Sequence, residues 1–205
     1  MLKRDLALAF AAGVFISIGG TVFLSCDDRY IGAVLFTVAL MSICDLGLYL
    51  YTGKIGYLVT AHAKQDVQTI LLTLLGNLLG TLTCGLLLPV AKPALAEKAA
   101  ALCAPKLTMS PLAILITAFF CGVLMYTAVS IYREKKSPIG ILFCVPVFIL
   151  SGFEHSIADM FYFAASGIVS LKAFGYIWII ILGNAIGALI LPCMEKVGTK
   201  ESVHE

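Results

Sequence analysis

The chain has 205 residues, of which 60% are hydrophobic and 13% are charged, and its mean hydropathy is +1.01. Soluble domains contain roughly 45–50% apolar and about 25% charged residues. This composition therefore excludes an ordinary soluble domain and indicates an integral membrane protein. The formal net charge is only +2 and the 14 Lys and Arg residues are dispersed, which excludes an extended basic surface for nucleic acid.

Six apolar segments are long enough to cross a bilayer, which takes about 20 residues in a helix. The first segment begins at the N-terminus, and we interpret it as a retained span because its apolar run is too long for a signal peptide. The second and the fifth exceed the length of one span. The segments lie at approximately 5–25, 31–60, 69–91, 110–132, 138–167 and 174–194.

The second and fifth segments are interrupted by helix-breaking or polar residues, in CDLGLYLYTGKIG at 44–56 and LSGFEHSIAD at 150–159. Paired broken helices are typical of transporter folds built from inverted repeats, where irregular backbone at membrane depth lines a cavity or is buried in protein. We therefore expect an all-α membrane protein with six transmembrane helices arranged as two inverted three-helix repeats. The expected single domain spans 1–205, with halves at approximately 1–91 and 110–194 and an external connecting loop at 92–109.

Basic residues near the span ends favour a cytoplasmic location for both termini, because cytoplasmic loops carry an excess of Lys and Arg. With the N-terminus inside, the larger basic set is cytoplasmic. That set is Lys3, Arg4, Lys64, Arg133, Lys135, Lys136, Lys196 and Lys200, against Arg29, Lys92, Lys98, Lys106 and Lys172 outside. We expect a multi-pass protein of the cytoplasmic membrane.

The stretch SGFEHSIADMF at 151–161 places Glu154, His155 and Asp159 in an otherwise apolar part of the chain. An ionisable group within a span is a functional candidate by default. Histidine is suited to proton exchange because its unperturbed pKa of about 6.5 lies in the physiological range. The sequence therefore predicts a functional site around His155.

This stretch resembles the signature S-G-F-E-H-S-[IV]-A-N-M-[FY] of the formate/nitrite transporter family, at the break in that family's fifth helix. Three further blocks resemble the family in the same order along the chain: AGVFISIGG at 12–20, LYTG at 50–53 and GNAIGA at 183–188. The resemblance thus covers nearly the whole chain. It implies an aquaporin-like protomer within a homopentamer, each protomer carrying its own pore for a small monovalent anion or its conjugate weak acid.

The resemblance also assigns places along the pore. His155 takes the place of the family's central pore histidine, and Asn184 that of the polar residue facing it, although the glycines around Asn184 are equally typical of close helix packing. The other implied residues are Leu50, Tyr51 and Thr52 in the loop of the broken second helix, Phe36, Leu40 and Phe148 at two apolar constrictions, and Lys3 or Arg4 at the cytoplasmic mouth.

Several charged residues depart from the family pattern and are expected to tune the site. Asp159 stands where members carry Asn; it would favour a cationic His155 if both share a helix face, or it pairs with Lys54 in the opposite broken helix. Lys54 is itself unusual, because members commonly carry a small or amide residue soon after the loop threonine. Asp45 is expected to take the role of an acidic residue that members place just before the loop of the second helix. Glu154 is expected to face the protein and hold the broken backbone.

Elementary electrostatics favours movement of the anion together with a proton. A bare carboxylate loses tens of kcal/mol of solvation in the idealised dry limit, whereas neutralising an acid with a pKa near 4 at pH 7 costs roughly 4 kcal/mol. We therefore expect proton-linked transport through His155, with formate as the first substrate and nitrite, hydrosulfide, acetate, lactate or bicarbonate as alternatives. Expected partners are this anion or acid, protons, membrane lipid and further copies of the chain.

Two other classes of function remain open: an intramembrane enzyme and a non-conducting sensor or scaffold. An intramembrane metal-dependent enzyme would use Glu154, His155 and Asp159, but H-x-x-x-D supplies only two ligands on one face. Seven cysteines lack any C-x-x-C pair and lie mostly in apolar runs, so we expect no disulfide framework or metal cluster. Together with the resemblance to a transporter family, this leads us to expect no enzyme and no cofactor. A non-conducting sensor or scaffold is the second alternative, with Lys54 closing the pore by pairing with Asp45 or Asp159.

Overall fold

The computed structural model describes the backbone of residues 2–59 and 64–201 and the side chains of 2–59 and 66–197. Every regular element in these ranges is helical. The elements are α1 (Leu2–Ser25), α2 (Arg29–Leu35), α3 (Thr37–Asp45), α4 (Tyr51–Lys54), the 3-10 helix η1 (Ile55–Val59), α5 (Lys64–Ala91), α6 (Pro93–Lys106), α7 (Pro111–Lys135), α8 (Ile139–Leu150), α9 (Ser156–Ser166) and α10 (Leu171–Glu201). Residues 46–50 form a first break, between α3 and α4, and residues 151–155 form a second break, between α8 and α9.

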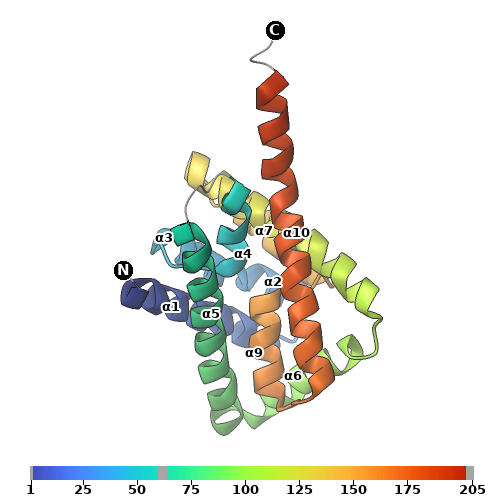
Figure 1. The fold of residues 1–205 in the computed structure, drawn as a ribbon. Helices are drawn as coiled ribbons and strands as arrows, with labels where there is room; N and C mark the ends of the chain where they lie inside the picture. The colour runs from blue at the N-terminus through green and yellow to red at the C-terminus, as the bar shows by residue number, and fades with distance from the viewer. Residues whose placement is uncertain (1, 60–63, 202–205) are drawn as a thin grey trace.

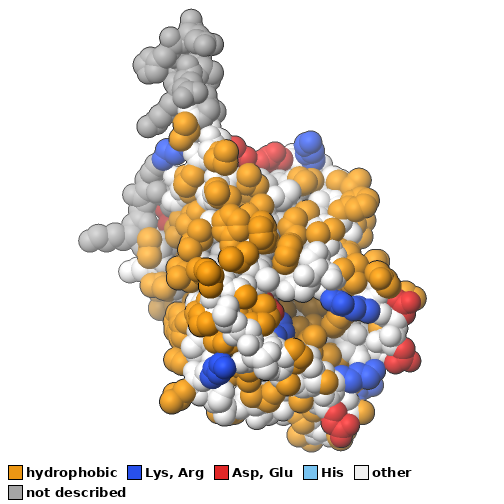
Figure 2. Space-filling view, turned by 90° about the vertical axis from the view of Figure 1, so that its right-hand side faces the viewer, with side chains coloured by type: hydrophobic (Ala, Val, Ile, Leu, Met, Phe, Trp, Pro, Cys, Tyr) orange, Lys and Arg blue, Asp and Glu red, His pale blue; other side chains and the backbone are white. Residues whose placement is uncertain are grey.

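Four described helices are long and apolar enough to cross a membrane: α1, α5, α7 and α10. Their outward surfaces carry many large hydrophobic side chains, such as Phe120 of α7 and Trp178 of α10, each about half exposed. Figure 2 shows that hydrophobic side chains cover most of one face of the molecule. A surface of this kind suits lipid or a neighbouring subunit, and the expectation of an all-helical membrane protein is confirmed.

The two breaks share one local geometry. Each contains a glycine in the left-handed region, Gly47 at φ +64° and Gly152 at φ +68°, where other residues are strained. The next residue, Leu48 or Phe153, donates its backbone N–H to the carbonyl oxygen five residues earlier, at 2.9 Å in both cases. These are helix C-caps of the Schellman type, so each helix stops at a defined residue before the chain becomes extended.

The long helices pack in two close pairs, α1 with α5 and α7 with α10. Figure 1 shows α5, α9 and α10 running alongside one another, with α1 and α7 crossing them obliquely. Glycines permit these crossings: a Cβ on Gly76 of α5 would lie 2.9 Å from the carbonyl oxygen of Leu6, and one on Gly183 of α10 would lie 2.8 Å from that of Leu115. Small residues thus bring helix backbones into direct contact.

Candidate functional site

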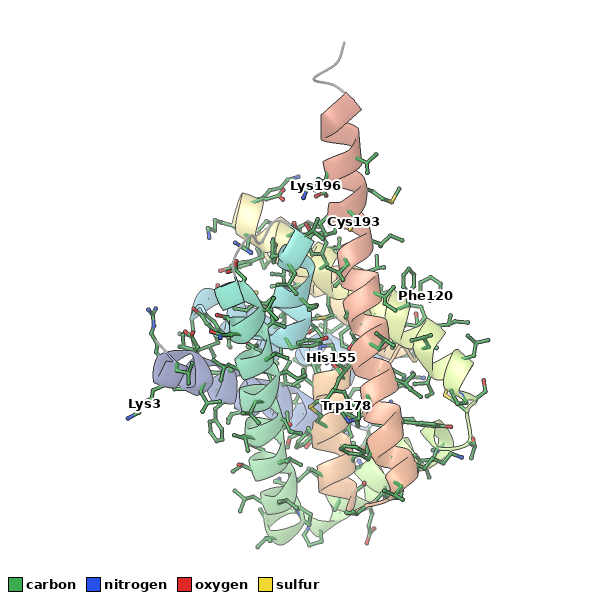
Figure 3. The ribbon with its side chains drawn as sticks, viewed as in Figure 1. Lys3, Phe120, His155, Trp178, Cys193 and Lys196 are labelled. Atoms are coloured by element: carbon green, nitrogen blue, oxygen red, sulfur yellow. The ribbon has the colours of Figure 1, made fainter. Side chains whose placement is uncertain are left out.

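His155 lies at the end of the second break and caps α9. Its Nδ1 accepts the backbone N–H of Ala158 at 3.1 Å, and its Nε2 lies 2.9 Å from Oγ1 of Thr52 in α4. Because Nδ1 is an acceptor, the neutral imidazole carries its proton on Nε2, which donates to the Thr52 hydroxyl oxygen. The histidine is 2% exposed and lies near the middle of the molecule in Figure 3. The structure therefore joins the two breaks through a histidine of defined tautomer.

Apolar side chains surround this histidine. The ring of Phe148 stacks on the imidazole with centroids 5.5 Å apart, and Phe36 meets Phe148 edge-on at 6.2 Å. Phe36, Leu40 and Phe148 are all buried. The structure brings the two aromatic constriction residues implied by the family resemblance into one cluster with His155.

Leu50 and Tyr51, which precede Thr52, make contacts different from those of Thr52. The hydroxyl of Tyr51 donates to the carbonyl oxygen of Ile181 in α10 at 3.3 Å, so this ring ties α4 to α10. Leu50 is buried and lines a cavity described below. Within the Leu50–Thr52 loop, the hydrogen bond to His155 is made by Thr52.

Asn184 holds the second break in place. Its side-chain oxygen accepts the N–H of Ser156, and its amide nitrogen donates to the carbonyl oxygens of Ala118 and Glu154, all at 2.8 Å. The side chain is fully buried. Each polar atom of the amide thus has a backbone partner, an arrangement that fixes the geometry of the break.

Asn77 of α5 makes the matching bonds at the first break, and the sequence interpretation missed it. Its oxygen accepts the N–H of Tyr51, and its amide nitrogen donates to the carbonyl oxygens of Ala9 and Tyr49, again at 2.8 Å. A signal was present, because GNLLG at 76–80 repeats the pattern of GNAIG at 183–187.

A buried ion cluster lies beside the second break. Lys106, at the end of α6, donates to the carboxylate of Glu154 and lies 2.8 Å from Oδ1 of Asp159. Burial opposes the charge of Lys106, but the carboxylates of Asp159 and Glu154 outweigh it and hold the pKa of Lys106 above its ordinary value. The alternative in which Asp159 pairs with Lys54 is therefore wrong, because Lys106 of α6 is the cation paired with Asp159.

A cavity of about 230 Å³ shares Leu40 with the apolar positions named above and is rich in basic groups. Its lining includes Leu40, Leu50, Tyr49, Lys54, Arg133 and Lys136. The Lys54 ammonium lies 3.7 Å from the centroid of the Tyr49 ring, and Arg133 lies 4.0 Å from that of Tyr57. Such cation–π contacts hold a cation without neutralising it.

The remaining predicted charges lie around or away from this cavity. Asp45 accepts a hydrogen bond from the hydroxyl of Tyr132. Among the described residues, Lys54 forms a salt bridge with neither Asp45 nor Asp159. Lys3 and Arg4 are exposed at the start of α1 and do not line the cavity; Figure 3 shows Lys3 far from His155. In the sequence, Arg133 and Lys136 belong to the basic set that indicates membrane orientation. Their spacing gives no sign that they line a cavity.

Comparisons with known proteins agree with this architecture. The fold is similar to a solved structure described as a pentameric formate channel with formate bound, with a TM-score of 0.81 and 21% identity over 97% of each chain. It is also similar to a structure described as an FNT family ion channel, with a TM-score of 0.73 and 23% identity over 93% of this chain and 86% of that one. A search of curated protein sequences found no match. The family model for formate/nitrite transporters matches residues 2–196, and the chain therefore belongs to the formate/nitrite transporter family.

Proposed function

We propose that this protein is a membrane channel for a small monovalent anion or its conjugate weak acid, with formate as the first substrate. Family membership supports transport rather than enzymatic chemistry. The observation that carries the proposal is the bond between Thr52 and the neutral imidazole of His155, enclosed by buried aromatic rings. Two polar groups in an otherwise dry passage suit a small polar solute that crosses without net charge.

Thr52 supplies the contact for the solute. Since its hydroxyl oxygen accepts from Nε2–H of His155, the hydroxyl hydrogen remains available to a carboxylate or carboxylic acid oxygen. Phe36 and Phe148 exclude bulk water and penalise a bare ion. A solute that enters with a proton loses far less solvation, so the passage favours the protonated acid or an anion and proton that cross together.

The basic cavity acts as the cytoplasmic entrance. Lys54, Arg133 and Lys136 raise the local concentration of anions through their combined positive potential. Leu40 and Leu50 contribute apolar side chains to the same lining. In this arrangement both chain termini lie in the cytoplasm, as the basic residues near the span ends predict.

The architecture we propose has six membrane crossings in two inverted three-helix repeats. The second crossing comprises α2 to η1 and the fifth comprises α8 and α9, with the halves at approximately 1–91 and 110–194 joined by the external segment 92–109. Support comes from the matched hydrogen bonds of Asn77 and Asn184 and the matched glycine caps. We propose a homopentamer because a similar solved channel is described as pentameric.

The test is uptake of labelled formate into liposomes that contain the purified protein. Wild-type protein should give uptake above protein-free liposomes, and an inward proton gradient should increase it. A His155→Phe variant that still assembles should lose this uptake, whereas Cys193→Ser, which changes an exposed thiol on α10, should retain it. Absence of protein-dependent uptake for formate, nitrite, hydrosulfide, acetate, lactate and bicarbonate would overturn the proposal.

A further inference from the structure

The cluster of Lys106, Glu154 and Asp159 contains one more negative group than positive. The side chains of Glu154 and Asp159 are 4% and 2% exposed, and that of Lys106 is 15% exposed. Oδ2 of Asp159 is buried and has no hydrogen-bond partner in the described part of the chain. Two carboxylates and one ammonium would leave a buried net charge of −1, together with an acceptor that nothing satisfies.

A bound proton resolves both problems. Two carboxylates that share one buried site cannot both ionise readily, and one of them takes up a proton instead. Lys106 cannot supply neutrality by itself, because it carries only one positive charge, and its raised pKa means that it keeps that charge. The cluster is then neutral with one carboxylate, one carboxylic acid and one ammonium.

His155 is poorly placed to hold this proton. Its Nδ1 already accepts the Ala158 N–H, and its Nε2–H donates to Thr52. A second proton on Nδ1 would have to displace the bond that caps α9, in a place where the ring is 2% exposed. The geometry therefore leaves His155 as the polar partner of Thr52 and leaves the proton to the carboxyl groups of the cluster.

The other titratable groups near Asp159 do not compensate its charge. Cys103 on α6, Cys121 on α7, Tyr162 on α9 and His155 all interact electrostatically with this carboxylate. Thiols and phenols are uncharged at neutral pH. Helices α1, α4, α5 and α10 also contact α9, but within the described residues Lys106 is the cation that pairs with Asp159.

We propose that Glu154 and Asp159 together bind one proton at neutral pH, and that this carboxyl pair, not the imidazole, sets the pH dependence of the pore. The inference rests on the proposed transport function only for its effect on flux. With the proton bound, the cluster beside His155 is neutral. When the proton leaves to external water as pH rises, the net charge becomes −1 and repels the anion, so flux falls.

Infrared spectroscopy of the purified protein in lipid tests the bound proton without any transport. The carbonyl stretch of a protonated carboxyl group, which shifts in D₂O, should be present at pH 7 in the wild type. It should disappear in Asp159→Asn and remain in Asp27→Asn, because Asp27 is a fully exposed carboxylate paired with Lys98. If the wild-type band is absent at pH 7, the proposal is wrong, whether or not the variants assemble.

Formate exchange measured with equal pH on both sides tests the consequence. Asp159→Asn should match the wild type at pH 6 and exceed it several-fold at pH 8, because the neutral amide leaves no excess negative charge. A variant that is slower by the same factor at every pH would show a merely structural role and overturn the assignment. If the infrared band is present but no formate flux exists in any variant, the proton site stands and the proposed transport function fails.

Discussion

Asn77 and Asn184 make equivalent hydrogen bonds at the two breaks, each accepting one backbone N–H and donating to two backbone carbonyl oxygens. They are the two asparagines of the chain. In each case the amide joins the start of a new helix to the preceding extended residues and to a neighbouring long helix. These two side chains therefore fix the backbone at both breaks.

Replacing either asparagine with aspartate should destabilise the protein. The carboxylate keeps the size of the amide but has no N–H to donate, so two buried carbonyl oxygens lose their partner. Each unsatisfied group costs about 1–3 kcal/mol, and we expect a clear drop in the thermal unfolding temperature of the purified protein. The matched control is Gln68→Glu, an exposed change from amide to acid on α5. An unchanged unfolding temperature in Asn184→Asp would contradict the anchoring role.

Removing the Thr52 hydroxyl should slow transport while leaving the fold intact. Thr52→Val keeps the shape but removes the acceptor for Nε2–H of His155, a bond worth about 0.5–1.5 kcal/mol. We expect formate uptake to fall roughly 2- to 12-fold, whereas Thr52→Ser should retain most of it. Equal uptake by the Val and Ser variants would remove the hydroxyl from the mechanism.

Lys106→Met should be strongly destabilising because it leaves the buried carboxylate of the Glu154 and Asp159 pair without a cation. Loss of one partner from a buried pair costs about 3–5 kcal/mol. The defect should shrink as pH falls, since protonation removes the uncompensated charge, and adding Glu154→Gln and Asp159→Asn should restore stability. Thermal unfolding across pH measures both effects.

The control for Lys106 is Lys98→Met, which removes a half-exposed lysine paired with the exposed Asp27. Surface pairs contribute little, so this variant should unfold like the wild type. A similar loss in both lysine variants, or a Lys106→Met defect that does not change with pH, would argue against the buried cluster as its cause.

The basic cavity should control anion entry from its own side of the membrane. Arg133→Gln and Lys136→Gln should lower the formate entry rate at low ionic strength, and added salt should reduce the difference because it screens the charges. Lys3→Gln and Arg4→Gln change exposed residues outside the cavity lining and should have the smaller effect. A larger effect of the Lys3 and Arg4 variants would instead place the anion entrance at the N-terminal residues.

The sequence predicted the membrane class because hydropathy depends on composition, and it predicted the neighbourhood of His155 because the motif surrounds that residue. It did not predict the partner of Asp159. Lys54 was chosen from its place in the opposite break, whereas the fold of α6 brings in Lys106 across 53 positions of the chain. Asn77 was open to prediction from the repeated G-N-x-x-G pattern. Contacts between residues so far apart in the chain depend on how the helices pack. A local sequence pattern does not determine that packing.

In the proposed mechanism a small acid crosses the membrane together with its proton. The most direct test of this mechanism is the internal pH of liposomes that contain the protein and a pH-sensitive dye, measured after formate is added outside. The lumen should acidify faster than in protein-free liposomes, labelled formate should enter on the same time course, and His155→Phe should abolish both. Rapid entry of labelled formate without protein-dependent acidification would mean that the bare anion crosses without a proton.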